Sequence, residues 1–342
     1  GRGDFVLSEL RGKPYLSGRL ELFDFDLNPY LSGQAPPPQP DQVAAAAATQ
    51  GAAGAAPQAT AEIAAVEAAP RAVDIASAPS EAPMDFSGLK AFNADLELVT
   101  RAVLVQHMRI DAARLNLVIN DGFMAATLHN ASLYGGSGRG RFEIDSRAPA
   151  TRMMYDLAFS SLDTRRFLAD AINFSNIEGR GELSLNVRVA GRTQSEMIAG
   201  ADGYAHMEIV SGTLHGVDLG GVASTIRNAL RGELIAPEAR TPFQGLSGTF
   251  AIADGVLATD NLSFNTADLR IPGVAVIDLP NRRLDARLAP RSPRGGVVVP
   301  FSARGTFGQF IYAHDLNDRA LREITPRVQQ VKAASRATAG QD

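Results

Sequence analysis

The chain has 342 residues, a formal net charge of −4 and 45% hydrophobic residues, so it is long enough for one large domain or two ordinary ones. Its Lys and Arg residues are scattered along the chain, whereas binding to nucleic acid needs clustered positive charge, so we expect no nucleic-acid partner. The sequence contains no cysteine, which excludes disulfides, thiolate metal sites and thiol nucleophiles.

The start of the chain carries no signal for a membrane or secretory segment. No run of about 18–20 apolar residues occurs, so we expect no membrane-spanning helix within these residues. Residues 1–5, GRGDF, lack a methionine, a charged start and an apolar signal core. We therefore expect that the chain is part of a longer protein.

Residues 1–83 divide into a strand and a linker. Residues 16–31, LSGRLELFDFDLNPYL, alternate polar and apolar side chains and then reach an Asn-Pro pair, which predicts a strand followed by a cap within a portion spanning residues 1–33. Residues 34–83 contain 20 Ala and 8 Pro in 50 positions and no aromatic residue. Such a segment cannot bury enough apolar surface to form a core, so we expect a disordered linker.

Residues 84–316 are dominated by short alternating runs, which predict one β domain of amphipathic antiparallel strands. A repeat of the form I-x-[DS]-G-x-[LM] occurs at residues 119–124, 209–214 and 252–257, and each copy predicts a hairpin turn because the Asp or Ser and the Gly suit tight reversal. Glycines also stand at the start of several runs, as in LYGGSGRGRFEI at residues 133–144. Such glycines suit a bend, a bulge or the close approach of a neighbouring backbone.

Few segments predict helices. Thr193 with Glu196 forms a capping box, Asp163 precedes a short apolar stretch, and Asp218 is a candidate N-cap for a helix over residues 219–231. Residues 317–342 form a basic tail, helical or disordered, that Pro326 is expected to interrupt. The tail is either a solvated helix or a segment close to anionic headgroups.

No pattern of residues predicts catalysis or a cofactor. The five histidines are far apart and lack the spacing of a metal-binding face, and no nucleophile motif occurs. We therefore expect a protein that is not an enzyme and that holds no metal and no cofactor.

The apolar faces of the strands exceed what the short helices can cover, so two outcomes are open. The sheet closes on itself and these residues form an ordinary core, or it curls lengthwise and offers a groove to acyl chains. The fold class that we expect is mainly β with a few short helices, in which an extended curled antiparallel sheet forms a groove or an open, barrel-like half-pipe. The candidate groove residues are Leu115, Leu117, Ile119, Phe142, Ile144, Tyr155, Leu157, Phe159, Leu183, Leu185, Val187 and Val189.

Several motifs, in their order, resemble the C-terminal region of the AsmA family. They are PMDFSGLKAFNADLELV at residues 83–99, LYGGSGRGRFEID at 133–145, SGTLHGVDLGGV at 211–222, LSGTFAIADGVLATDNLSF at 246–264 and VAVIDLPNRRLDARLAPR at 274–291. Residues 299–316 depart from the pattern, because relatives often carry a glycine-tryptophan turn there and this chain has no Trp. The resemblance covers most of residues 84–316, and residues 16–31 look like the end of an AsmA N-terminal portion.

The resemblance implies a periplasmic protein held to the inner membrane by an N-terminal helix that this chain lacks, with a role in outer-membrane biogenesis. For larger relatives it implies a conduit for phospholipid. The expected partner is a phospholipid or another envelope lipid, and an envelope protein partner is a further possibility. The alternative function is a scaffolding envelope protein with a closed β core.

Overall fold

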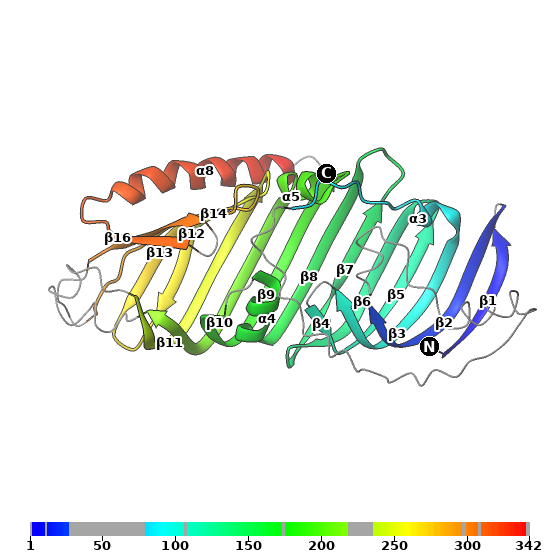
Figure 1. The fold of residues 1–342 in the computed structure, drawn as a ribbon, viewed down its shortest axis with the longest axis horizontal. Coiled ribbons are helices and arrows are strands. Elements are labelled where there is room, and N and C mark those ends of the chain that lie inside the picture. Colours follow the sequence, from blue (N-terminus) through cyan, green and yellow to red (C-terminus); the bar gives the residue numbers. More distant parts are fainter. Residues whose placement is uncertain are drawn as a thin grey trace, which may run out of the picture.

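The protein consists of one large β-sheet with helices along its borders (Figure 1). The computed structural model describes residues 2–10, 12–26, 79–105, 108–172, 175–217, 235–293, 295, 299–306 and 309–339. The strands are β1 (Arg2–Leu10), β2 (Lys13–Asp26), β3 (Asn93–Val105), β4 (Met108–Ile110), β5 (Ala112–Asn120), β6 (Phe123–Leu133), β7 (Gly136–Asp145), β8 (Thr151–Asp163), β9 (Ile177–Gly191), β10 (Asp202–Val217), β11 (Ile235–Ala253), β12 (Val256–Asn265), β13 (Arg270–Asp278), β14 (Arg283–Leu288), β15 (Phe301–Thr306) and β16 (Gln309–His314). The helices are α3 (Gly88–Ala91), α4 (Thr164–Ile172), α5 (Gln194–Ala199) and α8 (Arg319–Ala339).

The strands follow each other in sequence order except for β4, which pairs only with β3, and the 16-stranded sheet is not closed into a barrel. The expected fold class, an open curled β structure, is therefore confirmed. Among the described residues, every strand pair is antiparallel except β2 with β3, which run parallel from Tyr15 beside Asn93 to Asp26 beside Leu104. Parallel neighbours need a crossover connection. Residues 2–26 thus belong to the same sheet as residues 93–105, while most of the expected linker lies outside the described residues, and the division into domains stays a prediction.

Two of the three expected hairpin turns are present. Asp121 and Gly122 both have positive φ, 47° and 89°, and join β5 to β6, while Asp254 and Gly255, at 49° and 72°, join β11 to β12. These values are those of the two-residue turns that suit the twist of a hairpin. The prediction of a third turn, at Ser211, is wrong, because β10 continues to Val217. Its register on β9 shifts by one residue between Val210 and Gly212. Ser211, with φ 53°, is the extra residue of a β-bulge.

The glycines at the starts of runs do permit close backbone approach. At Gly140, φ is +149°, and an ideal Cβ would lie 2.1 Å from the carbonyl oxygen of Asp156 on the neighbouring strand. At Gly18, φ is +139°, and an ideal Cβ would likewise clash with the carbonyl oxygen of Asp4 on the neighbouring strand. No side chain fits at such positions, so strands β2 and β7 depend on glycine there.

The short helices begin where the sequence predicts. The Thr193 hydroxyl accepts a hydrogen bond from the N–H of Glu196 at 3.1 Å and so caps α5. The Asp163 carboxylate accepts one from the N–H of Arg166 at 3.2 Å at the start of α4. Both satisfy N–H groups that a helix leaves free. The helix expected over residues 219–231 lies outside the described residues.

The tail forms the long helix α8, and the interruption expected at Pro326 is wrong, because the helix continues through it from Arg319 to Ala339. Ala320, Ile324 and Val328 are buried against Ala258 and Val276 of the sheet. Burying such side chains contributes about 1.5–3 kcal/mol each for the larger ones, which is comparable with the cost of about 3 kcal/mol of a helix-interior proline. Tertiary packing therefore maintains the helix.

Candidate functional site

A continuous row of apolar residues crosses the sheet at right angles to the strands. Side chains that stand directly opposite each other on paired strands point to the same face. Leu115 pairs with Leu128, Gly140 pairs with Leu128 and Leu157, and Leu185 pairs with Leu157. We call the whole set the central row, and its members from β2 to β11 are Leu20, Leu98, Leu115, Leu128, Gly140, Leu157, Leu185, Ala205 and Phe250.

A second row runs beside it on the same face. Its members, from β2 to β11, are Gly18, Leu96, Leu117, Ala126, Phe142, Tyr155, Val187, Gly203 and Ile252. Tyr155 supplies the one polar group of the two rows, and its hydroxyl donates to the sulfur of Met153 at 3.2 Å. Burial raises the pKa of Tyr155, and the rings of Phe142 and Tyr155 lie 5.0 Å apart. The two rows together define the apolar face.

Most side chains of the central row are half-buried, although the row lies in the middle of the sheet. Leu115, Leu128, Leu157 and Leu185 are all in this state, and Ala205 is the buried exception. Side chains of a packed core are nearly all fully buried, whereas those on an outer surface are typically polar. The central row is therefore apolar but only partly covered, and we call this part of the apolar face the floor.

Helix α4 covers this face at one set of strand ends (Figure 1). Phe167 of α4 packs on a cluster that includes Leu133, Tyr134 and Leu162. The rings of Tyr134 and Phe167 meet edge to face at 5.8 Å, and the Tyr134 hydroxyl donates to Asp170 at 2.8 Å. Burial, with a further contribution from Asp170, raises the pKa of Tyr134, so its hydroxyl stays protonated and holds α4 in place.

The opposite strand ends are covered by α5 and by the segment that leads into α3. Met197 of α5 is buried against Ile144 and Met153, and Met84 and Leu89 pack on the same cluster. Backbone hydrogen bonds fix this segment, one from the N–H of Met84 to the carbonyl of Arg192 (2.8 Å) and one from the N–H of Gly122 to the carbonyl of Leu89 (2.9 Å). The two covered borders leave the central row between them. In the second row, Phe142 and Tyr155 pack on the α5 cluster, and Leu96, Val187 and Ile252 are buried.

The sequence model of the AsmA family matches residues 2–262. This is more than half of the chain. The chain belongs to the AsmA family. The family is linked to assembly of the cell envelope and of the outer membrane. No curated protein and no solved structure matches the chain.

In this AsmA-family sheet, the predicted groove residues occupy two different environments. Leu115, Leu117, Phe142, Tyr155, Leu157, Leu185 and Val187 belong to the central or the second row. The others lie under the borders: Phe159 and Leu183 beneath α4, Ile119 beside the segment before β3, and Ile144 and Val189 beneath α5. Arg141 and Glu143 point to the opposite face, as their alternation with Phe142 predicts.

Sequence reasoning missed Leu20, Leu98, Leu128, Ala205 and Phe250 of the central row. Leu128 directly precedes the bulge at His129, where the register of β6 shifts on both β5 and β7, so alternation along β6 does not reveal its partners. Ala205 and the glycines are too small to mark a strand face in the sequence. Only the pairing of neighbouring strands identifies these residues as one row, and that pairing is a property of the tertiary structure.

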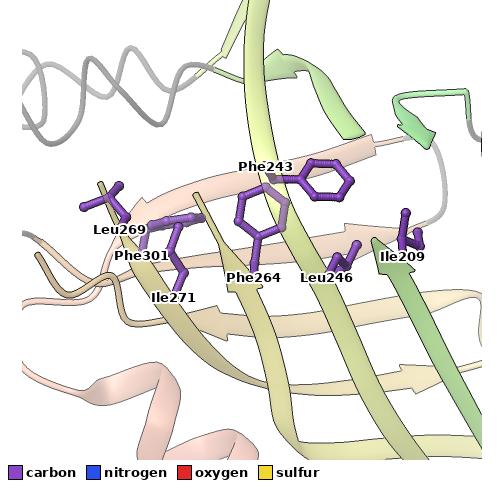
Figure 2. Close-up of a cluster of buried hydrophobic side chains, with 7 residues drawn as sticks. All are labelled: Ile209, Phe243, Leu246, Phe264, Leu269, Ile271 and Phe301. Atoms are coloured by element: carbon purple, nitrogen blue, oxygen red, sulfur yellow. The ribbon is translucent and has the colours of Figure 1, made fainter. Parts of the chain in front are cut away.

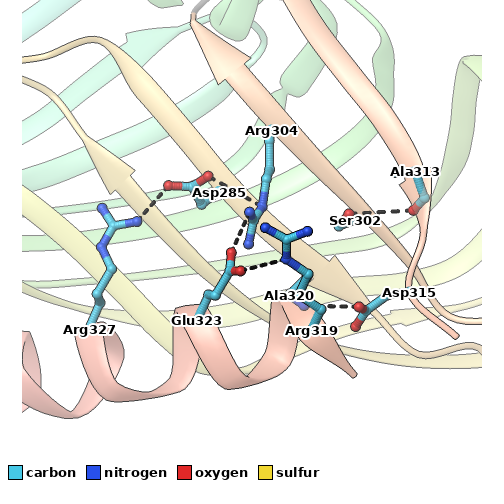
Figure 3. Close-up of polar contacts among 9 residues, drawn as sticks. All are labelled: Asp285, Ser302, Arg304, Ala313, Asp315, Arg319, Ala320, Glu323 and Arg327. Atoms are coloured by element: carbon cyan, nitrogen blue, oxygen red, sulfur yellow. Dashed lines mark hydrogen bonds and ion pairs between the residues drawn. The ribbon is translucent and has the colours of Figure 1, made fainter. Parts of the chain in front are cut away.

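The opposite face of the AsmA sheet, which we call the back face, carries α8, which is held there by apolar contacts and by ion pairs (Figure 3). Asp285 on β14 pairs with Arg327 of α8, and Arg304 on β15 pairs with Glu323 of α8 at 2.6 Å. Arg287 donates to Asp315 at 2.7 Å, and that carboxylate also accepts from the N–H of Ala320 at 2.9 Å. Since α8 packs on the back face, it leaves the apolar face uncovered.

The described residues bring no metal site together: no group of three His, Asp or Glu side chains there could hold an ion. His215 contacts Glu178 at 3.0 Å and His206 contacts Thr249 at 3.0 Å, each as a simple pair. None of the helices in this part of the chain has the length and apolar composition of a membrane-spanning segment.

Proposed function

We propose that this chain binds acyl chains of an envelope phospholipid on its apolar face, without catalysing a reaction. The observation that carries the proposal is the central row: nine residues on nine strands, none with a polar side chain, of which all but Ala205 are half-buried. Covering such a surface is favourable by about 25 cal/mol per Å² of apolar area.

The shape of the uncovered strip suits an acyl chain. On β9, Leu183 lies beneath α4 and Val189 beneath α5; of the two inward positions between them, Leu185 is half-buried and Val187 is buried. These two positions are about 7 Å apart along the strand, less than the diameter of about 10 Å of an α-helix with its side chains. The backbone groups of these inner strands are already paired in the sheet. A ligand without hydrogen-bonding groups therefore fits this floor.

The place of action that we propose is the periplasm, with attachment to the inner membrane by an N-terminal helix as the family resemblance implies. The link between the AsmA family and envelope assembly supports this placement. A role in lipid transport for outer-membrane biogenesis follows from the same two grounds, the family and the uncovered apolar face.

A second candidate is a scaffold that binds an envelope protein, and strand β1 favours it. All nine residues of β1 are exposed, with Phe5 at 56% and Leu7 at 69%. An exposed apolar edge strand is a template for pairing with another chain. The closed β core of this alternative is not supported, since the sheet is open. Chemical cross-linking in cells that traps one specific protein, with no lipid in the purified chain, would favour the scaffold.

Lipid binding is tested by replacing one residue of the floor. In Leu157→Glu a carboxylate enters the central row, and burying it beneath an acyl chain is costly, so we expect phospholipid to be lost from the protein. The matched control is Ser184→Glu, a half-buried position on the back face of the adjacent strand. Each protein is purified without detergent and extracted with solvent, its phospholipid is quantified, and circular dichroism checks the fold.

We expect phospholipid with the unchanged protein and with Ser184→Glu, and a loss of most of it with Leu157→Glu. An unchanged protein that carries no phospholipid, or equal amounts in both variants when both are folded, would contradict the proposal.

A further inference from the structure

The apolar face changes character between β11 and β15. The central and second rows are half-buried over most of β2–β9, but the residues that continue this face toward the C-terminal strands are fully buried. Figure 2 shows a cluster of buried side chains there, Ile209, Phe243, Leu246, Phe264, Leu269, Ile271 and Phe301, which we call the aromatic cluster. Its members are exposed by 7% or less.

The aromatic cluster lies on the same face as the floor. Ile209 pairs with Leu246, Leu246 with Phe264, and Phe264 with Ile271. Ile209 lies on β10 two residues beyond Met207, which pairs with Leu183, so it is on the side of the apolar face that α4 covers. The rings of Phe243 and Phe264 lie 5.1 Å apart. Over β10–β13 these side chains therefore fill the side of the apolar face that α4 covers over β8 and β9.

The last strands, β15 and β16, turn over the apolar face and close its C-terminal end. In Figure 2 β15 and β16 cross the direction of β11 and β12, and Phe301 of β15 points toward Ile271 and Leu269. Beyond Phe250, the inner positions of the following strands are buried as well: Thr259 is 1% exposed, and Ala275, which pairs with it, is 4% exposed. Because these side chains are small and still buried, other atoms of the protein lie directly over them and leave no room for an acyl chain.

From this change we infer that the acyl-binding groove is blind at β12–β15, so that a bound chain lies across β2–β11 and stops where Thr259 and Ala275 are buried, beside the aromatic cluster. The inference rests on the proposed lipid binding and adds where the lipid can and cannot go. Within the described residues the protein then holds acyl chains and receives and releases them on the β2–β11 side, and it does not pass them through to its C-terminal strands.

The length of the groove limits how many acyl chains it can hold. Nine strands at about 4.8 Å spacing span about 38 Å. One leaflet of a bilayer is about 15 Å of hydrocarbon, half of the core thickness. The uncovered floor therefore accommodates about two acyl chains end to end before the face becomes buried at β12.

The absence of cysteine makes a clean test possible, because a single introduced cysteine carries the only label. Three alanines, all half-buried and all in strands, are matched sites: Ala126 in the second row, Ala303 on β15 and Ala125 on the back face of β6. Ala303 pairs with Ala286, which pairs with Ala275, so it continues the apolar face beyond the blind end.

The full chain with Ala126→Cys, Ala303→Cys or Ala125→Cys is labelled with a small fluorophore and mixed with phosphatidylcholine that carries a nitroxide on one acyl chain. The nitroxide quenches fluorescence only at short range. We expect the label at residue 126 to lose most of its fluorescence, and the labels at 303 and 125 to show the same weak quenching as each other.

Quenching at 303 as strong as at 126 would overturn the blind groove while leaving lipid binding intact. Weak quenching at all three sites would instead remove lipid binding itself, and the blind groove with it. The two failures are therefore distinct.

Discussion

Gly140 illustrates how a single residue shapes the floor of the groove. It belongs to the central row, and its φ of +149° lies in a region that residues with a side chain rarely adopt. The carbonyl oxygen of Asp156 occupies the place where a Cβ would be. The residue therefore serves two purposes, since it lets β7 approach β8 and leaves the floor flat at that point.

Replacing Gly140 with alanine tests this role. We expect Gly140→Ala to lower the free energy of unfolding by about 1–3 kcal/mol, because of backbone strain and the clash with Asp156. The control is Gly245→Ala on β11, where an added Cβ meets nothing within 4 Å and where we expect a change within about 0.5 kcal/mol. Denaturant unfolding of both variants measures the difference, and equal stability of the two would show that the chain relaxes around residue 140.

At the scale of elements, α8 shows how a helix with a proline in its interior is held on the sheet. Its apolar side packs on Ala258 and Val276, and its charged side forms ion pairs with β14 and β15. Asp315 precedes the helix and joins both parts, since it accepts from Ala320 at the start of α8 and from Arg287 of the sheet. The carboxylate is 4% exposed in its side chain, so little water competes with these partners.

The pKa of Asp315 gives this contact a pH dependence. Burial alone raises this pKa, but the N–H of Ala320 and the guanidinium of Arg287 outweigh burial and hold it below its usual value of 3.8. Since the pKa is lower in the folded than in the unfolded state, the contribution to stability is fully present above about pH 4. It is lost as the pH falls through the lower, folded-state value.

We therefore expect Asp315→Asn to lower the free energy of unfolding by about 3 kcal/mol at neutral pH, because Arg287 is left without one of its charged partners in a buried place. The difference from the unchanged protein should shrink below about pH 4. Urea denaturation across the acid range measures it, with Asp156→Asn, an exposed carboxylate on the back face, as control. A difference that stays constant with pH would show that the charge of Asp315 is not what stabilises α8.

For the whole molecule, the parallel pair β2–β3 is the contact that makes one sheet of two distant segments. Leu16 and Leu20 of β2 pack against the cluster of Ala94, Leu96 and Ile119. This contact joins residues 2–26 to the remainder across the segment that the sequence identifies as a linker. The association of the two pieces therefore depends on sheet hydrogen bonds and apolar packing as well as on the covalent chain.

Cutting the linker tests this unity. A protease site inserted between residues 34 and 78 allows the folded protein to be cleaved there, and we expect the N-terminal piece to elute with the rest on size-exclusion chromatography. The paired length of β2 and its apolar contacts should hold it. As a control, the cleaved protein is run in denaturant, where the two pieces should elute separately. Separation of the pieces under native conditions would mean that residues 2–26 form a unit of their own.

The local pattern of the sequence predicted much of this protein. Alternation marked Leu183, Leu185 and Val187 as one face of β9, and Asp-Gly pairs marked two of the hairpins, because both features follow from the geometry of single strands and turns. The failures at Ser211 and Pro326 have one cause: at each position a packed neighbour, on β9 and β11 or on the sheet beneath α8, stabilises a conformation that the local sequence disfavours.

The sequence by itself determined the fold class, the amphipathic strands and the apolar character of one face, since these depend on the period and chemistry of neighbouring residues. Only the tertiary structure decided which apolar residues stay uncovered. Leu157 and Phe264 are alike in the sequence, each in an alternating strand, yet the first is half-buried in the floor and the second lies in the aromatic cluster. The register between strands, the side of the sheet that α8 covers and the turn of β15 over the face separate them, and all three join residues far apart in the chain.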